Sequence, residues 1–182
     1  MKINRMISND ALGCYDRIVH SGASVAMQRA GLPPSATSCL FSTLQKMRHH
    51  ARTQYGVSDV SFGTPPIDRE FTVPIQGVGQ GNGAGPQIWA VVSAPIVDVL
   101  RSEELLFTFH RSRDNSKIQF VGVLFVDDTD NGFTHPEVSD AAEVLCKAQQ
   151  VLSRWSESLD VTGGAIAPEK TFWYFLDYRW LS

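Results

Sequence analysis

An apolar run that ends in adjacent carboxylates is the feature that most constrains this chain. Residues 118–124 read Ile-Gln-Phe-Val-Gly-Val-Leu, and the next six residues, Phe-Val-Asp-Asp-Thr-Asp, hold three carboxylates. The apolar run predicts a buried strand over 118–126. Asp127 and Asp128 repel each other, and each disfavours ionisation of the other. Either a bound cation or a solvated turn would relieve this repulsion, and spacing alone favours the turn.

Composition restricts the class of protein. The chain has 182 residues, of which 43% are hydrophobic, which predicts one globular domain with a substantial core. The net charge of −3 does not support a free-standing nucleic-acid binder that depends on a basic face. A local basic patch stays open, and the densest basic segment, 46–52, is interpreted as a polar helix end in preference to a dedicated binding patch.

The cysteines and the apolar runs exclude further classes. The three cysteines are widely spaced and form no Cys-x-x-Cys pair, so neither a zinc site nor a disulfide framework is indicated, and a reducing compartment is expected. The longest apolar stretch, 88–100, is too short to span a bilayer and contains Pro95 and Asp98, so no membrane partner is expected.

The spacing of apolar residues, together with the Gly and Pro residues that end helices and strands, predicts an alternation of helices and strands. Helices are expected at 21–30, 35–50, 88–101 and 137–159. Strands are expected at 2–8, 105–110, 118–126 and in the aromatic tail 171–181, with a hairpin or irregular strands at 54–75 and a glycine-rich loop at 77–86. This order predicts a single α+β fold in which helices cover one face of a small sheet.

A second carboxylate cluster lies near the start of the chain. Asp10 follows the first predicted strand, and Asp16 comes six residues later. If that strand pairs with the one ending at Asp127 and Asp128, three carboxylates meet at one edge of the sheet. Such hard oxygen ligands suit Mg²⁺. The alternative is that Asp10 caps a helix.

Other polar segments carry weaker signals. The loop Gly-Val-Gly-Gln-Gly-Asn-Gly-Ala-Gly-Pro at 77–86 allows close approach of a phosphate, but it matches neither a dinucleotide fingerprint nor a P-loop. A flexible linker and a functional loop both remain open. Lys170, taken alone, is interpreted as a solvated lysine after a turn. The five histidines show no metal spacing and are interpreted as surface or capping residues: His20, His49, His50, His110 and His135.

Four segments, in this order, resemble the motifs of a reverse transcriptase palm of the kind carried by retrotransposons. The first is Asp-Ala-Leu-Gly-Cys-Tyr-Asp at 10–16, an aspartate followed by an aromatic and a second aspartate. The second is Gly-Gln-Gly at 79–81, with a proline six residues after the glutamine. The third is Phe-Val-Asp-Asp at 125–128, and the fourth is the glycine turn at 163–164 that leads to Lys170 and Thr171.

The resemblance implies an RNA-directed DNA polymerase domain, with a palm whose small antiparallel sheet is covered on one face by helices. It implies that Asp10, Asp127 and Asp128, with the Ala11 carbonyl, bind two Mg²⁺ ions, for which Mn²⁺ is the alternative. It further implies that Tyr15 lies under the sugar of a deoxynucleoside triphosphate, that Gln80 and Gly81 line the nucleotide and template pocket, and that Lys170 protonates the pyrophosphate leaving group. The partners would be an RNA or DNA template with its primer.

The resemblance also bears on domain organisation. Residues 1–182 correspond to a palm from which most of the fingers and the thumb are absent, and a partner chain that supplies these segments in trans is left open. Exposed apolar surface is expected in the aromatic tail, at 172–180. A retroelement polymerase acts in the cytoplasm or the nucleus. Two alternatives remain, a catalytically inactive palm remnant and a small phosphate-binding module built on the glycine loop.

Overall fold

The computed structural model describes residues 3–63, 76–135 and 140–176. The side chains of residues 3–4, 62–63, 135 and 175–176 are outside this description. The elements, in chain order, are β1 (Ile3–Asp10), α1 (His20–Arg29), α2 (Pro34–Lys46), β2 (Arg48–Thr53), β3 (Gly56–Gly63), α3 (Gly85–Ser102), β4 (Phe107–His110), β5 (Lys117–Phe120), β6 (Gly122–Phe125), β7 (Asp128–His135), α4 (Ala141–Val161), the 3-10 turn η1 (Pro168–Lys170) and β8 (Phe172–Leu176).

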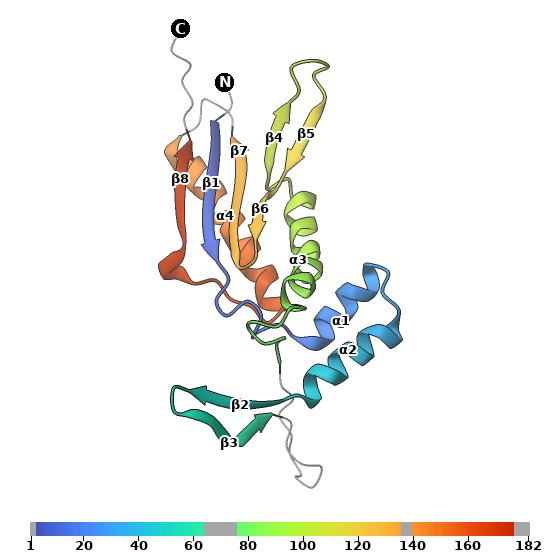
Figure 1. Cartoon of the computed structure of the whole chain (residues 1–182). Helices are drawn as coiled ribbons and strands as arrows, with labels where there is room; N and C mark the ends of the chain where they lie inside the picture. Colours follow the sequence, from blue (N-terminus) through green and yellow to red (C-terminus); the bar gives the residue numbers. More distant parts are fainter. Residues whose placement is uncertain (1–2, 64–75, 136–139, 177–182) are drawn as a thin grey trace.

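The main sheet has four antiparallel strands in the order β6-β7-β1-β8 (Figure 1). In the central pair, Asp10 of β1 lies opposite Asp128 of β7, and Ile7 lies opposite Asn131. Helix α4 contacts β1 and β7 on one face of the sheet, and α3 contacts α4. The predicted α+β fold is therefore confirmed. Among the described residues, no helix has the length and apolar character needed to cross a membrane.

The core lies between the sheet and its helices. Ile7 and Phe133 contribute buried side chains from the two central strands. Helix α4 places its buried residues on one stripe because they recur at helical spacing: Val144, Val151, Trp155 and Leu159. Helix α3 is buried along much of its length through Ile88, Trp89, Val92, Ser93, Ile96 and Leu100. The apolar patterns of both helices were readable in the sequence.

The apolar run 118–126 does not form the single buried strand that its composition predicts. The chain divides at Val121, so that β5 pairs only with β4, while β6 pairs with β7 at the edge of the main sheet. Val121 is buried, whereas Ile118, Val123 and Phe125 are 43%, 56% and 73% exposed. Both strands lie at sheet edges, so apolar composition here does not imply burial.

Strand β7 is central to the sheet, yet its sequence, Asp-Thr-Asp-Asn-Gly-Phe-Thr-His, gave no strand prediction. Its buried side chains alternate as Thr129, Asn131 and Phe133, and only the last of these is apolar. Pairing with β1 and β6 on either side stabilises the strand through its backbone. A polar composition therefore concealed a strand that is held mainly by its neighbours.

The predicted helix 35–50 ends earlier than expected. Helix α2 stops at Lys46, Met47 is extended, and β2 begins at Arg48. The interpretation of the basic segment 46–52 as a polar helix end is therefore wrong, because most of it is the first strand of a hairpin with β3. The partner strand lies beyond a turn in the chain, so local propensity alone did not reveal it. Residues 64–75 of the predicted irregular region lie outside the described residues.

The C-terminal predictions hold where they can be compared. Helix α4 begins at Ala141, later than the predicted residue 137, and Asp140 caps it by accepting a hydrogen bond from the Ala142 amide at 3.3 Å. Strand β8 occupies part of the predicted aromatic strand. Its residues Phe172, Trp173 and Tyr174 are each about half exposed, as expected for this tail. The remainder of the tail, 177–182, lies outside the described residues.

Gly132 in β7 provides a test of this packing. A Cβ atom at position 132 would lie 1.8 Å from the Cζ atom of Phe107, whose buried ring lies against the strand. We expect Gly132→Ala to lower the free energy of unfolding by about 1–3 kcal/mol, because the ring must move within a packed site. Urea denaturation measures the change. Gly83→Ala, where a Cβ has no neighbour within 4 Å, is the control and should stay within about 0.5 kcal/mol of wild type. Equal losses in both variants would contradict the packing.

Candidate functional site

A polar cavity of about 200 Å³ lies at the end of the main sheet where β1 finishes. Segments that are far apart in the sequence meet in it: the end of β1 and the turn after it, the glycine loop, the turn between β6 and β7, and η1. The residues that line it are Asp10, Ala11, Leu12, Gly13, Tyr15, Asp16, Gln80, Asp127 and Lys170. Each of the four sequence motifs therefore contributes at least one side chain to one cavity.

Backbone hydrogen bonds hold Asp10 at the centre of this arrangement. The Ala11 amide donates to the Asp127 carbonyl at 3.0 Å, and the Ala167 amide donates to the Asp10 carbonyl at 2.9 Å. Ala11 also forms an isolated bridge with Ile166. These bonds extend the pairing of β1 on both sides. Asp10, with only 9% of its surface exposed, thereby faces the β6–β7 turn and the segment that carries Lys170.

The β6–β7 turn presents Asp127 to the cavity. Val126 and Asp127 form the turn between the paired residues Phe125 and Asp128. Val126 has φ +60°, which is rare for a β-branched residue and marks local backbone strain. Asp127 lines the cavity and is half-buried, whereas Asp128 is exposed and lies outside the lining, although it pairs with Asp10 in the sheet.

The glycine loop is bound to the segment after β1 and is not a free linker. The Gly77 amide donates to the Ile18 carbonyl and the Val78 amide donates to the Tyr15 carbonyl, both at 2.8 Å. The Gln80 amide donates to Asp16 Oδ1 at 3.1 Å. Gly77 has φ +81°, and a Cβ there would lie 2.5 Å from the Asp16 carbonyl oxygen, so this close approach requires glycine. The hydrogen bonds of this loop, including the one from Gln80 to Asp16, bring Gln80 to the cavity.

His20 supports the same loop and was misassigned from sequence. It was interpreted as a surface or capping residue, but it is buried. Its Nε2 donates to the Gly77 carbonyl, and its Nδ1 accepts from the Gln45 amide at 3.2 Å. The ring also packs against Phe41 with centroids 4.9 Å apart. No spacing in the sequence indicates these contacts, because its partners come from a loop and from α2.

Lys170 is the cation of the cavity. Its ammonium donates to Asp10 Oδ2, and this hydrogen bond, together with the charge of Asp10, raises the pKa of Lys170 above its usual value. The side chain is 64% exposed, so it reaches Asp10 from the solvent side. The interpretation of Lys170 as a simply solvated residue is therefore replaced by a direct ion pair with the predicted metal ligand.

The cavity is electronegative despite this ion pair. Burial in the first place, and then the negative charges of Asp127, Asp10 and Asp16, together raise the pKa of the Cys14 thiol to about 12. The pKa of Tyr15 is also raised, first by burial and then by Cys14 and Asp127. Three carboxylates thus act on the same small region, and one ammonium offsets only part of their charge.

The donor set fits a hard divalent cation through two carboxylates. Asp10 and Asp127 both line the cavity, next to the backbone of Ala11, and oxygen ligands of this kind are those that Mg²⁺ prefers. Within residues 3–63, 76–135 and 140–176, however, no three His, Cys, Asp or Glu side chains gather closely enough to form a metal site. The assignment of Asp128 as a third ligand therefore stays a prediction. Gly81 is exposed and also lies outside the lining.

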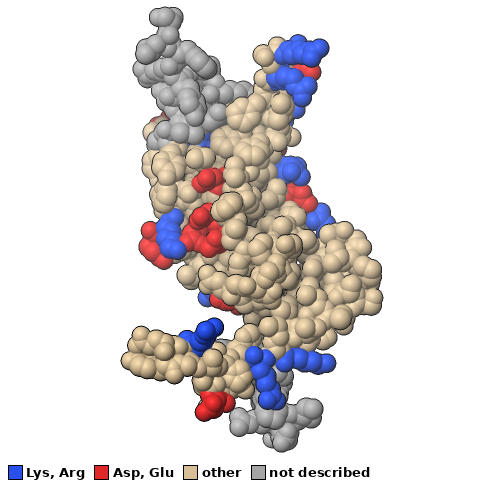
Figure 2. Space-filling view, in the orientation of Figure 1, with Lys and Arg blue, Asp and Glu red and all other residues tan. Residues whose placement is uncertain are grey.

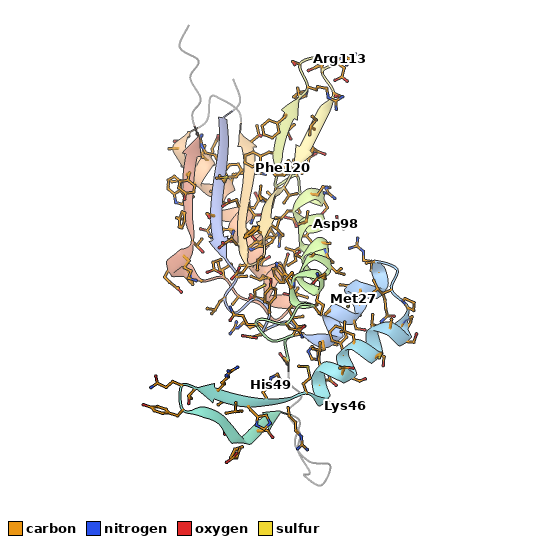
Figure 3. All side chains as sticks on the ribbon, in the orientation of Figure 1. Met27, Lys46, His49, Asp98, Arg113 and Phe120 are labelled. Carbon is orange, nitrogen blue, oxygen red and sulfur yellow. The ribbon has the colours of Figure 1, made fainter. Side chains whose placement is uncertain are left out.

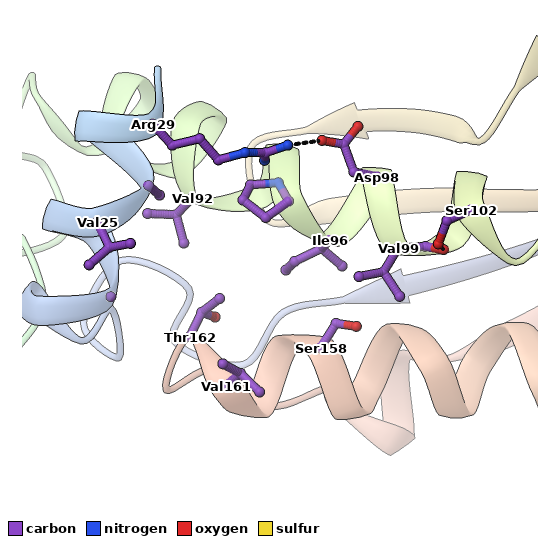
Figure 4. A pocket seen from close by; sticks show the side chains of 13 residues that line it. Val25, Arg29, Val92, Ile96, Asp98, Val99, Ser102, Ser158, Val161 and Thr162 are labelled. Atoms are coloured by element: carbon purple, nitrogen blue, oxygen red, sulfur yellow. Dashed lines mark hydrogen bonds and ion pairs between the residues drawn. The ribbon is translucent and has the colours of Figure 1, made fainter. Parts of the chain in front are cut away.

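A larger cavity of about 740 Å³ lies between α1, α3 and α4 (Figure 4). Its walls are mainly aliphatic, and its one ion pair joins Arg29 to Asp98 at 2.8 Å. The hydroxyls of Ser102 and Thr162 donate to carbonyls of their own helices. No set of polar groups converges on this space, so the smaller polar cavity is the better candidate for chemistry.

The comparisons with known proteins concern the fold. No protein-family model matches the sequence, and no curated protein matches it. Among solved structures, the chain is similar to apo telomerase from Candida tropicalis, truncated from its C-terminal domain, with a TM-score of 0.57 and 15% sequence identity. The match covers 98% of this chain and 32% of the telomerase chain. At this identity the likeness shows a shared fold, and the chain spans about a third of that protein.

The thiol of Cys14 reports on the charge of the cavity. At pH 8 we expect iodoacetamide to alkylate the exposed Cys39 and Cys146 and to leave Cys14 largely unmodified, because the thiolate is the reactive form and the pKa of Cys14 is about 12. Mass spectrometry of tryptic peptides over a time course measures the three rates. Asp127→Asn should increase the Cys14 rate, because it removes one of the charges that raise this pKa. Alkylation of Cys14 at the rate of Cys39 would contradict the described environment.

Proposed function

We propose that this chain is the palm of an RNA-directed DNA polymerase of retrotransposon type, which adds deoxynucleotides to a primer 3′-hydroxyl. The observation that carries the proposal is the meeting of Asp10, Gln80, Asp127 and Lys170 in one cavity. These residues come from four separate segments, and each is the residue that the resemblance selects in its own motif. The fold shared with a telomerase supports the proposal.

In this proposal Asp10 and Asp127, with Asp128 and the Ala11 carbonyl, hold two Mg²⁺ ions. When bound, such a pair of ions activates the attacking hydroxyl and stabilises the leaving oxygen. The net negative charge of the cavity, seen in the raised pKa of Cys14, supports cation binding. Asp16 would have a positioning role, because its carboxylate accepts a hydrogen bond from the Gln80 backbone amide and so holds the glycine loop in place.

The remaining cavity residues position the nucleotide and move a proton. Tyr15 is half-buried and lines the same cavity as Asp10, where its ring would lie under the sugar and exclude a 2′-hydroxyl. The primer 3′-hydroxyl would lose its proton to solvent water as its oxygen forms a bond to the α-phosphorus, and the bond from that phosphorus to pyrophosphate would break. The Lys170 ammonium would then transfer a proton from Nζ to the leaving pyrophosphate oxygen. Its raised pKa keeps this group protonated at neutral pH.

The runner-up is a palm remnant that binds but does not catalyse. The position of Asp128 favours it, since this predicted third ligand lies outside the cavity lining and no three candidate ligands gather among the described residues. In the catalytic proposal, fingers and thumb segments would come from outside residues 1–182. An independent phosphate-binding module on the glycine loop is less well supported, because the loop is bonded to Tyr15, Asp16 and Ile18 and forms one wall of the carboxylate cavity.

Primer extension tests the catalytic proposal. We expect the wild-type chain to extend a primer on an RNA template with Mg²⁺ and deoxynucleotides, and we expect no extension by the double variant Asp127→Asn, Asp128→Asn, because its carboxylates no longer hold the cation. Binding of Mn²⁺, followed by electron paramagnetic resonance, should be lost in parallel. Asp130→Asn is the matched control, since Asp130 lies in β7 outside the cavity lining. Mn²⁺ binding without extension by the wild type would favour the remnant.

The role of Lys170 has a separate test. Lys170→Gln should slow single-turnover extension by about 10²–10⁴-fold, the range for loss of a general acid. It should also tighten Mn²⁺ binding, because Asp10 loses the ammonium that now pairs with it. Rapid-quench kinetics and paramagnetic resonance measure the two effects. If the variant instead weakened Mn²⁺ binding, Lys170 would be supporting the site and not competing with the cation.

A further inference from the structure

The β2–β3 hairpin stands apart from the rest of the fold (Figures 1 and 3). Its two strands pack on each other, and no other element of the described chain makes more than slight contact with them. All of β2 except His49 is exposed, and Tyr55 in the turn is 90% exposed. Because the hairpin adds little to the core, packing within this chain does not explain its sequence.

The charge of this hairpin is opposite to that of the chain as a whole. Lys46, Arg48 and Arg52 lie at or just before β2, and Asp59 is the only acidic residue in 46–63. None of the three cations has an ion-pair partner among the described residues. The net charge of the whole chain is −3. A protein with excess negative charge therefore concentrates unpaired positive charge on one projecting element.

The hairpin projects below the end of the main sheet where β1 finishes, which is the end that carries Asp10 (Figure 1). Figure 2 shows Lys and Arg side chains around the hairpin and the end of α2, and acidic side chains at that end of the sheet above them. A nucleic acid that reaches an electronegative cavity needs cations for its own phosphates nearby. The hairpin is a surface that supplies them.

We propose that the β2–β3 hairpin is a nucleic-acid-binding arm that holds an unpaired stretch of the template strand. Lys46, Arg48 and Arg52 would neutralise its phosphates, and the exposed ring of Tyr55 would stack on one of its bases. Basic side chains combined with an exposed aromatic are the features that single-stranded nucleic acids require. The proposal rests on the proposed function for the identity of the strand as template, but RNA binding by the hairpin can be measured without catalysis.

Fluorescence anisotropy with a labelled 15-nucleotide RNA tests the arm. The double variant Arg48→Gln, Arg52→Gln removes two cations from exposed positions, so the hairpin should keep its fold. We expect its affinity to fall about tenfold or more near 50 mM salt. The slope of log K against log salt should become shallower by about 1.4, because each phosphate contact on a single strand contributes about 0.7. Circular dichroism checks that both proteins are folded.

Two further variants decide between specific binding and simple charge loss. Arg113→Gln, Lys117→Gln removes the same charge from the β4–β5 hairpin, where both residues are exposed, and should change affinity less than about threefold. Tyr55→Ala should weaken binding about fivefold or more through lost stacking, while Tyr55→Phe should retain the affinity.

The outcomes separate this inference from the proposed function. Three outcomes would each overturn the proposed RNA-binding arm. The first is an equal loss of RNA affinity in both charge variants, the second is an unchanged affinity in the Arg48→Gln, Arg52→Gln variant, and the third is no RNA binding by the wild type. An unchanged affinity would leave the exposed valines of β3 as a surface for a polypeptide. Hairpin-dependent RNA binding by a chain that fails to extend a primer would uphold the arm and overturn the catalytic function. Primer extension that does not depend on Arg48 and Arg52 would uphold the catalytic function and overturn the arm.

Discussion

The antiparallel pairing of β1 with β7 is the constraint on which the rest of the structure depends. Its register places Asp10 opposite Asp128 and Ile7 opposite Asn131. Because strand side chains alternate between faces, a slip of one residue would turn Ile7 away from the helices and Asp10 into them. Burial of an unpaired carboxylate is costly, so the core and the cavity favour the same register. The Ala11–Asp127 hydrogen bond continues this pairing into the β6–β7 turn.

Negative charges gather in the cavity and positive charges gather on the β2–β3 hairpin, and their surroundings differ. In the cavity, Asp10 pairs with the Lys170 ammonium and Asp16 accepts a hydrogen bond from the Gln80 backbone amide, while Asp127 lines the open polar cavity. On the β2–β3 hairpin Arg48 and Arg52 face solvent and have no ion-pair partner among the residues that the structure describes. An acidic cavity attracts cations and repels phosphates, and separate basic side chains are then needed if a nucleic acid is to approach it.

The sequence motifs selected residues that lie together in space, whereas two strands were predicted wrongly or missed. Motif order selected Asp10, Ala11, Tyr15, Gln80, Asp127 and Lys170, and these residues do line one cavity, while their chemical roles stay predictions. Gly81 and Asp128 were selected too and lie outside the lining. Strand β7 was missed because two of its three buried side chains are polar, and 118–126 was misread because apolar residues at a sheet edge stay exposed. The sequence did not indicate that His20 is buried and hydrogen-bonded, since its partners lie in two other segments.

The sequence by itself determined the helices that carry an apolar stripe, the α+β class and the identity of the motif residues, because these depend on local spacing and on side-chain chemistry. Only the tertiary structure decided which strand lies beside β1, that Lys170 pairs with Asp10, that His20 supports the glycine loop, and that the basic segment after α2 forms a projecting hairpin. Each of these depends on contacts between residues far apart in the chain, and such contacts form only when backbone pairing and burial act together.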